Sequence, residues 1–394
     1  MLDFLTRGSG MKKKVVILAS YVLVAALSAA AAFGLSAGQM RTGKLQQLQA
    51  LIEEKFIGDA DSTALEDAAA DAMVKATGDR WSYYISAEDY EAYTENMNNA
   101  YQGVGITITV EDGGMRIVEV YAGSGAAEAG VEPQDLLIAV EDTDVRGMET
   151  GDVRDLIRGA ENTFVTLTVL RSGEELRFQV ERRQVEIPVV FSQMITETVG
   201  YVAIDNFDTR CAQEAIAAIE DLLGQGARKL LFDVRYNPGG YADELVELLD
   251  YLLPEGDLFR TIRYDGQAHV DTSDANCLDM PMAVLINADS YSAAEFFAAA
   301  LQEYEAATVV GQKSVGKGYF QNTFRLSDGS AVALSVGKYF TPKGVSLAEV
   351  GVTPDVECPV DEDTAAMIYY GTLEPLEDPQ IRAALEALGE KLPD

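Results

Sequence analysis

Short apolar segments and amphipathic helical segments alternate over residues 199–304, and this alternation restricts the fold more than any other feature. Each apolar segment has the length of a buried strand, and the segments between them have apolar residues at helical spacing. Strands that alternate with helices form a parallel sheet with helices packed on its faces. The pattern predicts an α/β domain with strands 200–204, 229–234 and 282–287, helices 211–223, 242–253 and 292–304, and a closing hairpin of 320–326 and 331–338.

The amino-terminal segment has a different pattern. Arg7 and Lys12–Lys14 precede an uncharged, almost wholly apolar stretch at residues 15–35. A helix of this length spans roughly 30 Å, the thickness of a bilayer's hydrocarbon core. The basic residues predict a cytoplasmic amino terminus with the rest of the chain outside. We expect an uncleaved membrane anchor, and a cleaved signal segment with a site near Ala29–Ala32 is the alternative.

Charge and composition exclude several function classes. The formal net charge of −34, from 64 acidic and 30 basic residues, argues against a nucleic-acid partner. Three cysteines and the single histidine, His269, are too few for a thiolate or histidine-rich metal site. His269 lies in a polar stretch that predicts an exposed loop. We expect no metal and no other cofactor.

Two further regions precede the α/β domain. Apolar residues at helical spacing over 44–97 predict a small helical region. From residue 101 the pattern changes to short alternating strands with one helix near 150–158. These elements predict a compact, half-open β-barrel with strands 106–110, 115–120, 136–140, 164–170 and 175–180.

Ser292 lies where the apolar segment 282–287 leads into an alanine-rich helix. At such a turn a serine lies at the positive end of the helix dipole, where unpaired backbone N–H groups can stabilise an oxyanion. Serine is also a preferred N-cap residue, so this segment alone favours helix capping. A second turn, Asn237–Gly240, follows strand 229–234 and can present a backbone N–H at the same edge of the sheet.

Lys317 lies between two glycines at the start of a predicted strand. Period-2 alternation places Lys317, Tyr319 and Gln321 on one face of that strand. A lysine can act as general base toward a serine if burial lowers its pKa from about 10.4 toward 7 or 8. A solvated lysine in a glycine-rich turn is the ordinary alternative.

Together these segments resemble the carboxy-terminal processing peptidases, or tail-specific proteases, which are serine peptidases with a Ser-Lys dyad. The resemblance extends from about residue 56 to 380 and covers nearly all of the chain outside the apolar stretch. Many ordered matches at family-like separations are more specific than any single match. They are Gly103–Ile106, Gly123–Ala127, Asp233–Gly240, Ser292–Glu295, Gly316–Gly318, Gln321, Tyr339–Gly344, Gly351–Asp355 and Asp378–Gln380.

The resemblance implies the catalytic roles. The family's nucleophile precedes a glutamate by three residues, which is Ser292 in this chain. The general base falls on Lys317, and Gln321 is the residue that orients this lysine. Such a dyad needs no histidine.

The resemblance also implies the oxyanion donors and two departures from the family. The donors would be the backbone N–H groups of Ala293 and of Gly239, which we choose over Gly240. Tyr236 stands where the family commonly has Asn, and Ala294 where it commonly has Ser. Neither replaces a reacting group, so these departures bear on substrate preference more than on activity.

The β-rich region resembles a PDZ domain of the bacterial protease type. This resemblance implies that a peptide adds as a strand to the sheet edge. Its terminal carboxylate would be held by backbone N–H groups of the loop formed by Gly103, Val104, Gly105 and Ile106. An ordinary glycine-containing start of a strand is the alternative.

The predicted fold is therefore multidomain, of the α/β and α+β classes, with an N-terminal membrane helix, a small helical region, a PDZ-like β-barrel and an α/β catalytic domain with a mixed sheet. The expected domains are a cytoplasmic stub with anchor or signal segment (1–40), a helical region (41–98), a PDZ peptide-binding domain (99–184), a Ser-Lys peptidase domain (185–360) and a helical carboxy-terminal tail (361–394).

The expected function is that of a serine endopeptidase in the cell membrane, with its catalytic part outside the cytoplasm. It would cleave proteins at or near their carboxyl ends through an acyl-enzyme on Ser292, with the PDZ domain binding the free tail and gating activity. The expected partners are protein or peptide substrates with free tails and the membrane, and a homo-oligomer is left open. Two alternatives are a catalytically silent membrane-tethered PDZ scaffold, which the presence of Ser292, Lys317 and Gln321 argues against, and a small-molecule hydrolase, which the PDZ module argues against.

Overall fold

The structure is a computed structural model that describes residues 43–391. The chain divides into two compact units, Met1–Gly78 and Asp79–Asp394. The expected membrane helix at residues 15–35 lies outside the described residues. Within residues 43–391, no helix has the length and apolar character needed to span a bilayer.

The described part of the first unit consists of two helices, α2 (Lys44–Lys55) and α3 (Ser62–Lys75). Asp61 caps α3 by accepting hydrogen bonds from two backbone N–H groups of its first turn. Gln49 on α2 donates a hydrogen bond to Glu66 on α3 (3.0 Å). The helical spacing in this part of the sequence therefore produces a helix pair.

A six-stranded sheet forms the centre of the catalytic domain. Its strands follow the order β10-β11-β12-β15-β16-β19. Every neighbouring pair is parallel except β10 and β11, so the sheet is mixed. The strands are β10 (Val190–Met194), β11 (Val199–Ile204), β12 (Lys229–Asp233), β15 (Met282–Ile286), β16 (Ala307–Gly311) and β19 (Val356–Glu357).

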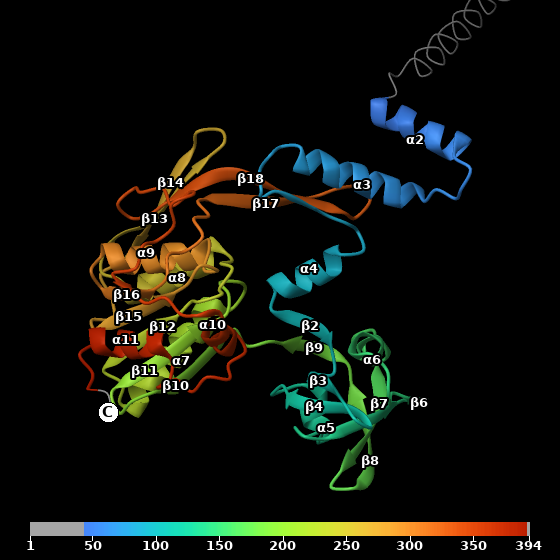
Figure 1. Cartoon of the computed structure of the whole chain (residues 1–394), viewed down its shortest axis with the longest axis horizontal. Coiled ribbons are helices and arrows are strands. Elements are labelled where there is room, and N and C mark those ends of the chain that lie inside the picture. The colour runs from blue at the N-terminus through green and yellow to red at the C-terminus, as the bar shows by residue number, and fades with distance from the viewer. Residues whose placement is uncertain (1–42, 392–394) are drawn as a thin grey trace, which may run out of the picture. The chain divides into compact units, whose positions relative to one another are not determined.

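Helices cover both faces of this sheet (Figure 1). Leu230 and Phe232 pack into the core formed with α7, α8 and α9, whereas Leu231 between them packs with α11 on the opposite face. Strands buried on both faces must be apolar at every position, which explains the uninterrupted apolar runs of the sequence. The packed helices are α7 (Cys211–Gln225), α8 (Ala242–Leu252), α9 (Ala293–Glu303) and α11 (Pro379–Ala387). The helix α10 (Glu362–Tyr369) follows β19 and buries none of its residues.

A buried charge network attaches α11 to the end of β12. Arg235 Nε donates to Asp233 Oδ1 (2.9 Å), and Arg235 Nη1 donates to Asp378 Oδ2 (2.7 Å) and to Gln380 Oε1 (2.9 Å). Asp378 also caps α11 by accepting from the N–H of Gln380 (2.8 Å). The Asp-Pro-Gln segment therefore joins the carboxy-terminal helix to the strand that precedes the turn at Asn237–Gly240.

The predicted hairpin forms, but it belongs to a second sheet with the order β1-β18-β13-β14, in which β17 pairs with β18. Its first strand comes from the segment expected to be helical, which contains both β1 and α4. His269 lies in the edge strand β14 and not in the expected loop, because one side of an edge strand faces solvent and tolerates a polar sequence. These elements are β1 (Tyr83–Ile85), α4 (Tyr90–Met97), β13 (Gly256–Arg263), β14 (Ala268–Ser273), β17 (Tyr319–Arg325) and β18 (Ala331–Phe340).

The β-rich module contains its own sheet and core. The sheet has the order β3-β4-β5-β7-β8, with β6 paired to β5, and β3 is an edge strand. The helix α6 packs against β3 and β5. The elements are β3 (Ile106–Glu111), β4 (Gly114–Val120), α5 (Gly125–Ala129), β5 (Leu136–Val140), β6 (Thr143–Asp144), α6 (Thr150–Ile157), β7 (Phe164–Arg171) and β8 (Glu174–Glu181).

Two paired strands connect this module to the rest of the chain. The strand β2 (Ala100–Gly103) leads into the module, and β9 (Arg183–Glu186) leads out of it. They pair antiparallel, with Gly103 opposite Arg183. The chain therefore enters and leaves the module at neighbouring points.

Candidate active site

Ser292 lies at the sharp turn between β15 and α9. Its backbone has φ 60° and ψ −126°, a strained conformation for a residue with a Cβ atom. A strained strand-to-helix turn of this kind can hold a nucleophilic serine above the edge of a sheet. The N–H of Glu295 donates to the Ser292 carbonyl oxygen (2.9 Å), and the Ser292 hydroxyl makes no hydrogen bond that caps α9. The hydroxyl is therefore free of the capping role that the sequence alone favoured.

Gly239 packs directly against this turn. It has φ +90°, and a Cβ atom at this position would lie 2.6 Å from Ser292 Cβ and 2.8 Å from the Ala293 nitrogen. Only glycine combines this backbone conformation with such a close approach. The N–H of Ala293 lies in the first turn of α9 and has no partner among the described residues. The N–H of Gly239, in contrast, donates to Asn237 Oδ1 (2.7 Å). One expected oxyanion donor is thus free and the other is occupied.

Hydrogen bonds fix the two turns to each other. Ser290 Oγ donates to the Val234 carbonyl (2.8 Å) and accepts from the Asn287 N–H (3.0 Å). Asn287 Oδ1 in turn accepts from the Tyr236 N–H (2.9 Å). The turn after β12 and the turn after β15 therefore form one connected structure at the carboxyl edge of the sheet.

The side chain of Lys317 is half-buried between aromatic rings. Its Nζ lies 5.0 Å from the centroid of the Trp81 ring and 5.6 Å from that of the Tyr291 ring. Burial lowers the pKa of Lys317, and the nearby carboxylates of Glu295 and Asp79 partly oppose this effect. The result is a greater fraction of neutral amine at a given pH than a solvated lysine has.

Ser292 and Lys317 line one cavity of about 1100 Å³. Within the described part of the chain, no hydrogen bond joins Lys317 Nζ to Ser292 Oγ. The hydrogen bonds that the two residues share pass through their backbone N–H groups, which both donate to Glu295 Oε2. The structure brings the two expected catalytic residues into the same cavity without direct contact between their reacting atoms.

Glu295 connects the two segments that carry these residues. Its side chain is fully buried and accepts four hydrogen bonds, from the N–H of Ser292 (2.9 Å), Gly316 (2.7 Å) and Lys317 (2.8 Å) and from the Ser314 hydroxyl (2.5 Å). Burial raises the pKa of Glu295, and these hydrogen bonds act in the opposite direction. The carboxyl group thus sets the position of the start of α9 relative to the lysine loop.

No role for Glu295 is predicted from the sequence. A signal was present, because a serine followed three positions later by a glutamate has the spacing of a capping box. The contacts with residues 314–317 had no local signal, since they join segments that are about twenty positions apart in the chain.

Gln321 lines the same cavity, but no hydrogen bond joins it to Lys317 within residues 43–391. Its amide group donates to the Tyr319 carbonyl (3.1 Å) and to Ser335 Oγ (3.0 Å). The pairing register of β17 shifts between Phe320 and Gln321, and residues 320–324 all line the cavity, whereas Tyr319 does not. The expected placement of Tyr319 on one face with Lys317 and Gln321 is therefore wrong.

His269 also lines this cavity. Its Nε2 lies 3.0 Å from Asp271 Oδ1, and its side chain is 72% exposed. No hydrogen bond joins it to Ser292 within residues 43–391. The arrangement of the described residues is therefore not that of a Ser-His-Asp triad, in which the histidine contacts the nucleophile.

The two departures from the family lie outside the cavity lining. The Tyr236 hydroxyl donates to the Ala365 carbonyl (3.0 Å), and its ring centroid is 5.1 Å from that of Tyr369. Ala294 is fully buried in the core beneath α9. Both positions therefore affect packing, with α10 in one case and with the core in the other, and not the shape of the cavity.

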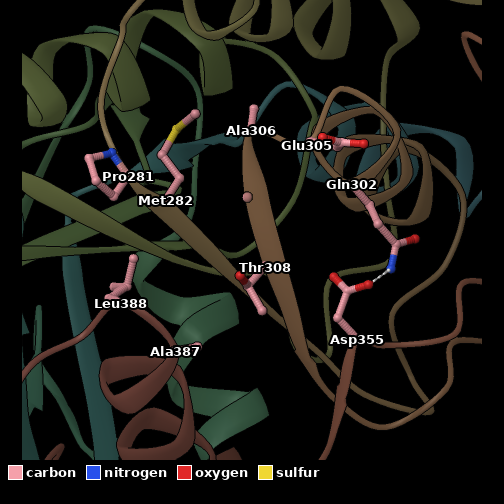
Figure 2. Close-up of a pocket in the computed structure, with 10 residues that line it drawn as sticks. Pro281, Met282, Gln302, Glu305, Ala306, Thr308, Asp355, Ala387 and Leu388 are labelled. Carbon is pink, nitrogen blue, oxygen red and sulfur yellow. Dashed lines mark hydrogen bonds between the residues drawn. The ribbon is translucent and has the colours of Figure 1, made fainter.

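A smaller cavity of about 390 Å³ lies elsewhere in the catalytic domain (Figure 2). It is found where β15 and β16 begin, near Pro281, Met282 and Leu388, whereas Ser292 follows the end of β15. Its polar contact is a hydrogen bond from Gln302 Nε2 to Asp355 Oδ1 (2.8 Å). None of the expected catalytic residues lines this cavity.

The expected peptide-binding loop of the β-rich module has free donors. The carbonyl oxygen of Val104 accepts from the Ala126 N–H (2.9 Å), and that of Gly105 accepts from the Tyr121 N–H (3.0 Å). The N–H groups of Val104 and Gly105 donate to no other described residue. They lie immediately before the edge strand β3, which begins at Ile106.

Comparison with known proteins identifies the family of the chain. Residues 198–358 match the family model described as Peptidase family S41, and residues 116–171 match the one described as PDZ domain. The chain is 30% identical to the carboxy-terminal processing protease CtpA of Bacillus subtilis over 325 residues, an alignment that covers 82% of this chain and 70% of that protein. It is also 30% identical to the carboxyl-terminal-processing protease of Synechocystis over 355 residues, an alignment that covers 86% of this chain and 80% of that protein. A solved structure described as an S41 protease from Bacteroides fragilis has the same fold, with a TM-score of 0.51 at 18% identity over 87% of this chain and 97% of that one. The chain therefore belongs to peptidase family S41 and is a serine-type peptidase of the carboxy-terminal processing group that carries a PDZ domain.

Proposed function

We propose that this peptidase cleaves proteins outside the cytoplasm at or near their carboxyl ends, with Ser292 as nucleophile and Lys317 as general base. The position of Lys317 carries the proposal. Its ammonium group is desolvated in the cavity that Ser292 also lines, and this desolvation lowers its pKa. A lysine must be neutral to accept a proton from serine, so the environment favours the required form.

The chemistry follows from these roles. Neutral Lys317 Nζ accepts the Ser292 hydroxyl proton while Oγ bonds to the scissile carbonyl carbon, and the N–H of Ala293 stabilises the oxyanion. The resulting lysine ammonium then protonates the leaving amine as the C–N bond breaks, which leaves an ester on Ser292. Water attacks this ester with Lys317 again as base, and the new carboxyl end is released.

Two observations support a resting site whose reacting groups are not yet aligned for this reaction. Lys317 Nζ lies near two aromatic rings and makes no hydrogen bond to Ser292 Oγ in the described structure, and the Gly239 N–H is bonded to Asn237 Oδ1. We assign to substrate binding the release of the Gly239 N–H and the approach of the lysine, with Gln321 orienting its amine. A ligand that binds the aligned state more tightly shifts the population toward it.

The PDZ module supplies a means of binding the tail. The free N–H groups of Val104 and Gly105 form a site for a terminal carboxylate, and the edge strand β3 can pair with the preceding residues of the peptide. Binding of a free tail here raises the local concentration of substrate and biases the catalytic domain toward its aligned state.

We place the peptidase at the cell membrane, with its catalytic part outside the cytoplasm. The support comes from the apolar stretch 15–35 and the basic residues before it. Mass spectrometry of the amino terminus of the mature protein distinguishes a retained anchor, which keeps residues 1–40, from a cleaved signal segment, which loses them.

The test of the proposed activity uses the full chain in mild detergent with an unstructured protein as substrate, beside a Ser292→Ala control. The proposal expects cleavage by the first and none by the second. A silent PDZ scaffold would bind free tails without cleavage, and a small-molecule hydrolase would hydrolyse esters without cutting the protein. Equal cleavage by both preparations would contradict the role of Ser292.

A further inference from the structure

Asp208 lies beside the turn that packs against Ser292. The preceding residue, Phe207, pairs with Gly240 in a parallel bridge, and its N–H donates to the Gly239 carbonyl (2.8 Å). Asp208 lines the same cavity as Ser292 and Lys317. Its carboxyl group is therefore placed at the cavity that the reacting groups also line.

This carboxyl group lacks partners. Among buried side-chain nitrogen and oxygen atoms of the described residues, Asp208 Oδ1 is the only one that makes no hydrogen bond. Its second oxygen also accepts none within residues 43–391, and it is not enclosed as Oδ1 is. Burial of a carboxyl group without a partner is costly, so the second oxygen, which is open to the cavity, indicates that a ligand supplies a partner to this carboxyl group.

No cation of the described chain neutralises Asp208. Burial and, to a smaller extent, the carboxylate of Glu244 together raise the pKa of Asp208 to about 7. The basic residues that line the cavity are Arg80, Arg263, His269 and Lys317, and none of them contributes to the pKa of Asp208. The Arg80 guanidinium lies 4.2 Å from the centroid of the Trp81 ring, and Lys317 Nζ lies near the same ring. The titratable groups that interact with Asp208 are all acidic or neutral: Glu244, Tyr83, Tyr241, Tyr291 and Cys211.

We infer that Asp208 is a specificity-determining residue that binds the ammonium group of a substrate lysine close to the scissile bond. This inference rests on the proposed function, since it names a side chain that the same site selects. Lysine fits better than arginine because Oδ1 is enclosed and only one oxygen is open to the cavity. A compact ammonium group can pair with one carboxylate oxygen, whereas a guanidinium group binds a carboxylate most strongly when it donates hydrogen bonds to both oxygens.

The test uses the full chain and a series of peptides with acetylated amino ends, in which one lysine moves along an otherwise neutral sequence. Each peptide has a counterpart with norleucine in place of lysine, and kcat/KM is measured for both. At one or two positions beside the cut, lysine should be preferred by on the order of tenfold to a hundredfold, the range expected for a hydrogen-bonded charge pair. Asp208→Asn should remove most of this preference. In the unmodified enzyme, kcat/KM for peptides with arginine at these positions should lie between the values for the lysine and norleucine peptides.

Asp243→Asn is the matched control. Asp243 is an exposed acid that lines the same cavity, and its substitution should leave the lysine-to-norleucine ratio unchanged. Loss of the preference in both variants would indicate a general charge effect and would overturn the inference.

The pH dependence of the ratio provides a second measurement that needs no variant. Asp208 is neutral below its pKa of about 7 and charged above it, so the preference for lysine should appear as the pH rises through this value. Titration of Lys317 affects both peptides of a pair equally and cancels in the ratio. Equal cleavage of all pairs at every pH overturns the role of Asp208 and leaves the protease assignment intact, whereas failure to cleave any peptide contradicts the proposed function itself.

Discussion

At the scale of single residues, Ser290 and Ser292 lie two positions apart but have different roles: Ser292 is the proposed nucleophile, and Ser290 makes buried hydrogen bonds. Ser292→Ala should abolish turnover and leave the free energy of unfolding nearly unchanged, because its hydroxyl caps nothing. Ser290→Ala should retain the nucleophile but lower the free energy of unfolding by about 1–3 kcal/mol, because two buried hydrogen bonds are lost. Peptide hydrolysis and urea unfolding measure the two effects. Turnover that survives in Ser292→Ala would show that the nucleophile is another residue.

The depressed pKa of Lys317 has a direct kinetic consequence. The protonated amine cannot accept the serine proton, so kcat/KM should rise with pH through the lowered pKa of Lys317 and then level off. Lys317→Arg should be inactive, because guanidinium stays protonated at every accessible pH. His269→Ala should follow the profile of the unmodified enzyme, since His269 does not contact Ser292. A pH-independent rate in the unmodified enzyme would eliminate the lysine as base.

Gly239 can be tested against a glycine with the same backbone conformation. Gly239→Ala introduces a Cβ atom 2.6 Å from Ser292 Cβ and should displace the nucleophile, with loss of most activity. Gly266 has φ +83° but nothing within 4 Å of the added atom, so Gly266→Ala carries only the cost of the backbone conformation, about 1 kcal/mol. Hydrolysis rates of the two variants separate the steric effect from the conformational one. Equal rates would mean that the contact with Ser292 is unimportant.

At the scale of elements, the parallel strands and their helices could be predicted from the sequence because local pattern and tertiary environment agree. The strand β12 is buried on both faces and reads as one apolar run, and α8 has a clear apolar stripe. The strand β1 has only three residues, too few to show a period, and β14 is a largely exposed edge strand. The strand β1 exists because β18, which is distant in the chain, offers a partner, and β14 exists because it pairs with its chain neighbour β13.

The contact between the start of α9 and the loop before β17 depends on Glu295, and its loss has a predictable effect. Glu295→Gln places an amide donor opposite backbone N–H groups, so kcat should fall by as much as about a hundredfold through misplacement of Ser292 and Lys317. Because the charge of Glu295 raises the pKa of Lys317, its removal should also shift the pH profile of kcat/KM to lower pH.

Glu303 provides the control on the same helix. It accepts hydrogen bonds from the Thr341 hydroxyl (2.6 Å) and the Lys343 N–H (2.7 Å) at the opposite end of α9. Glu303→Gln should lower stability without moving the pH profile. A profile in Glu295→Gln that matches the unmodified enzyme would reduce Glu295 to a structural residue.

At the scale of the whole molecule, the role of the PDZ module can be tested by changing the substrate alone. Substrates whose carboxyl ends are amidated lose the charge that the N–H groups of Val104 and Gly105 would bind, so their kcat/KM should fall by roughly tenfold or more. This test is cleaner than Gly105→Glu, because a Cβ atom at Gly105 would lie 2.1 Å from Ser124 Cβ and disturb the packing of the module itself. Unchanged cleavage of amidated substrates would leave the protease assignment in place and exclude tail binding.

The alignment of the site is a property of the whole molecule that the sequence could not reveal. The motifs indicated which residues gather at the edge of the sheet, and Ser292, Lys317, Gln321 and Gly239 all line one cavity. Whether Gly239 donates to Asn237 or to a substrate depends on rotamers and on contacts between distant segments. Small free-energy differences between conformations decide which of these contacts form, and such differences cannot be predicted from the pattern of residues in the sequence.

The pairing of β2 with β9 has a consequence for how such a chain can be altered. Because Gly103 lies opposite Arg183, the ends of the PDZ insertion are already as close as the two strands of a hairpin. Deletion of residues 104–182 would leave a gap that a two-residue turn can close, and no strand of the peptidase sheets would be cut. The same two strand ends can accept a different peptide-binding module, so the recognition part can be exchanged as a unit while the catalytic domain keeps its own sequence.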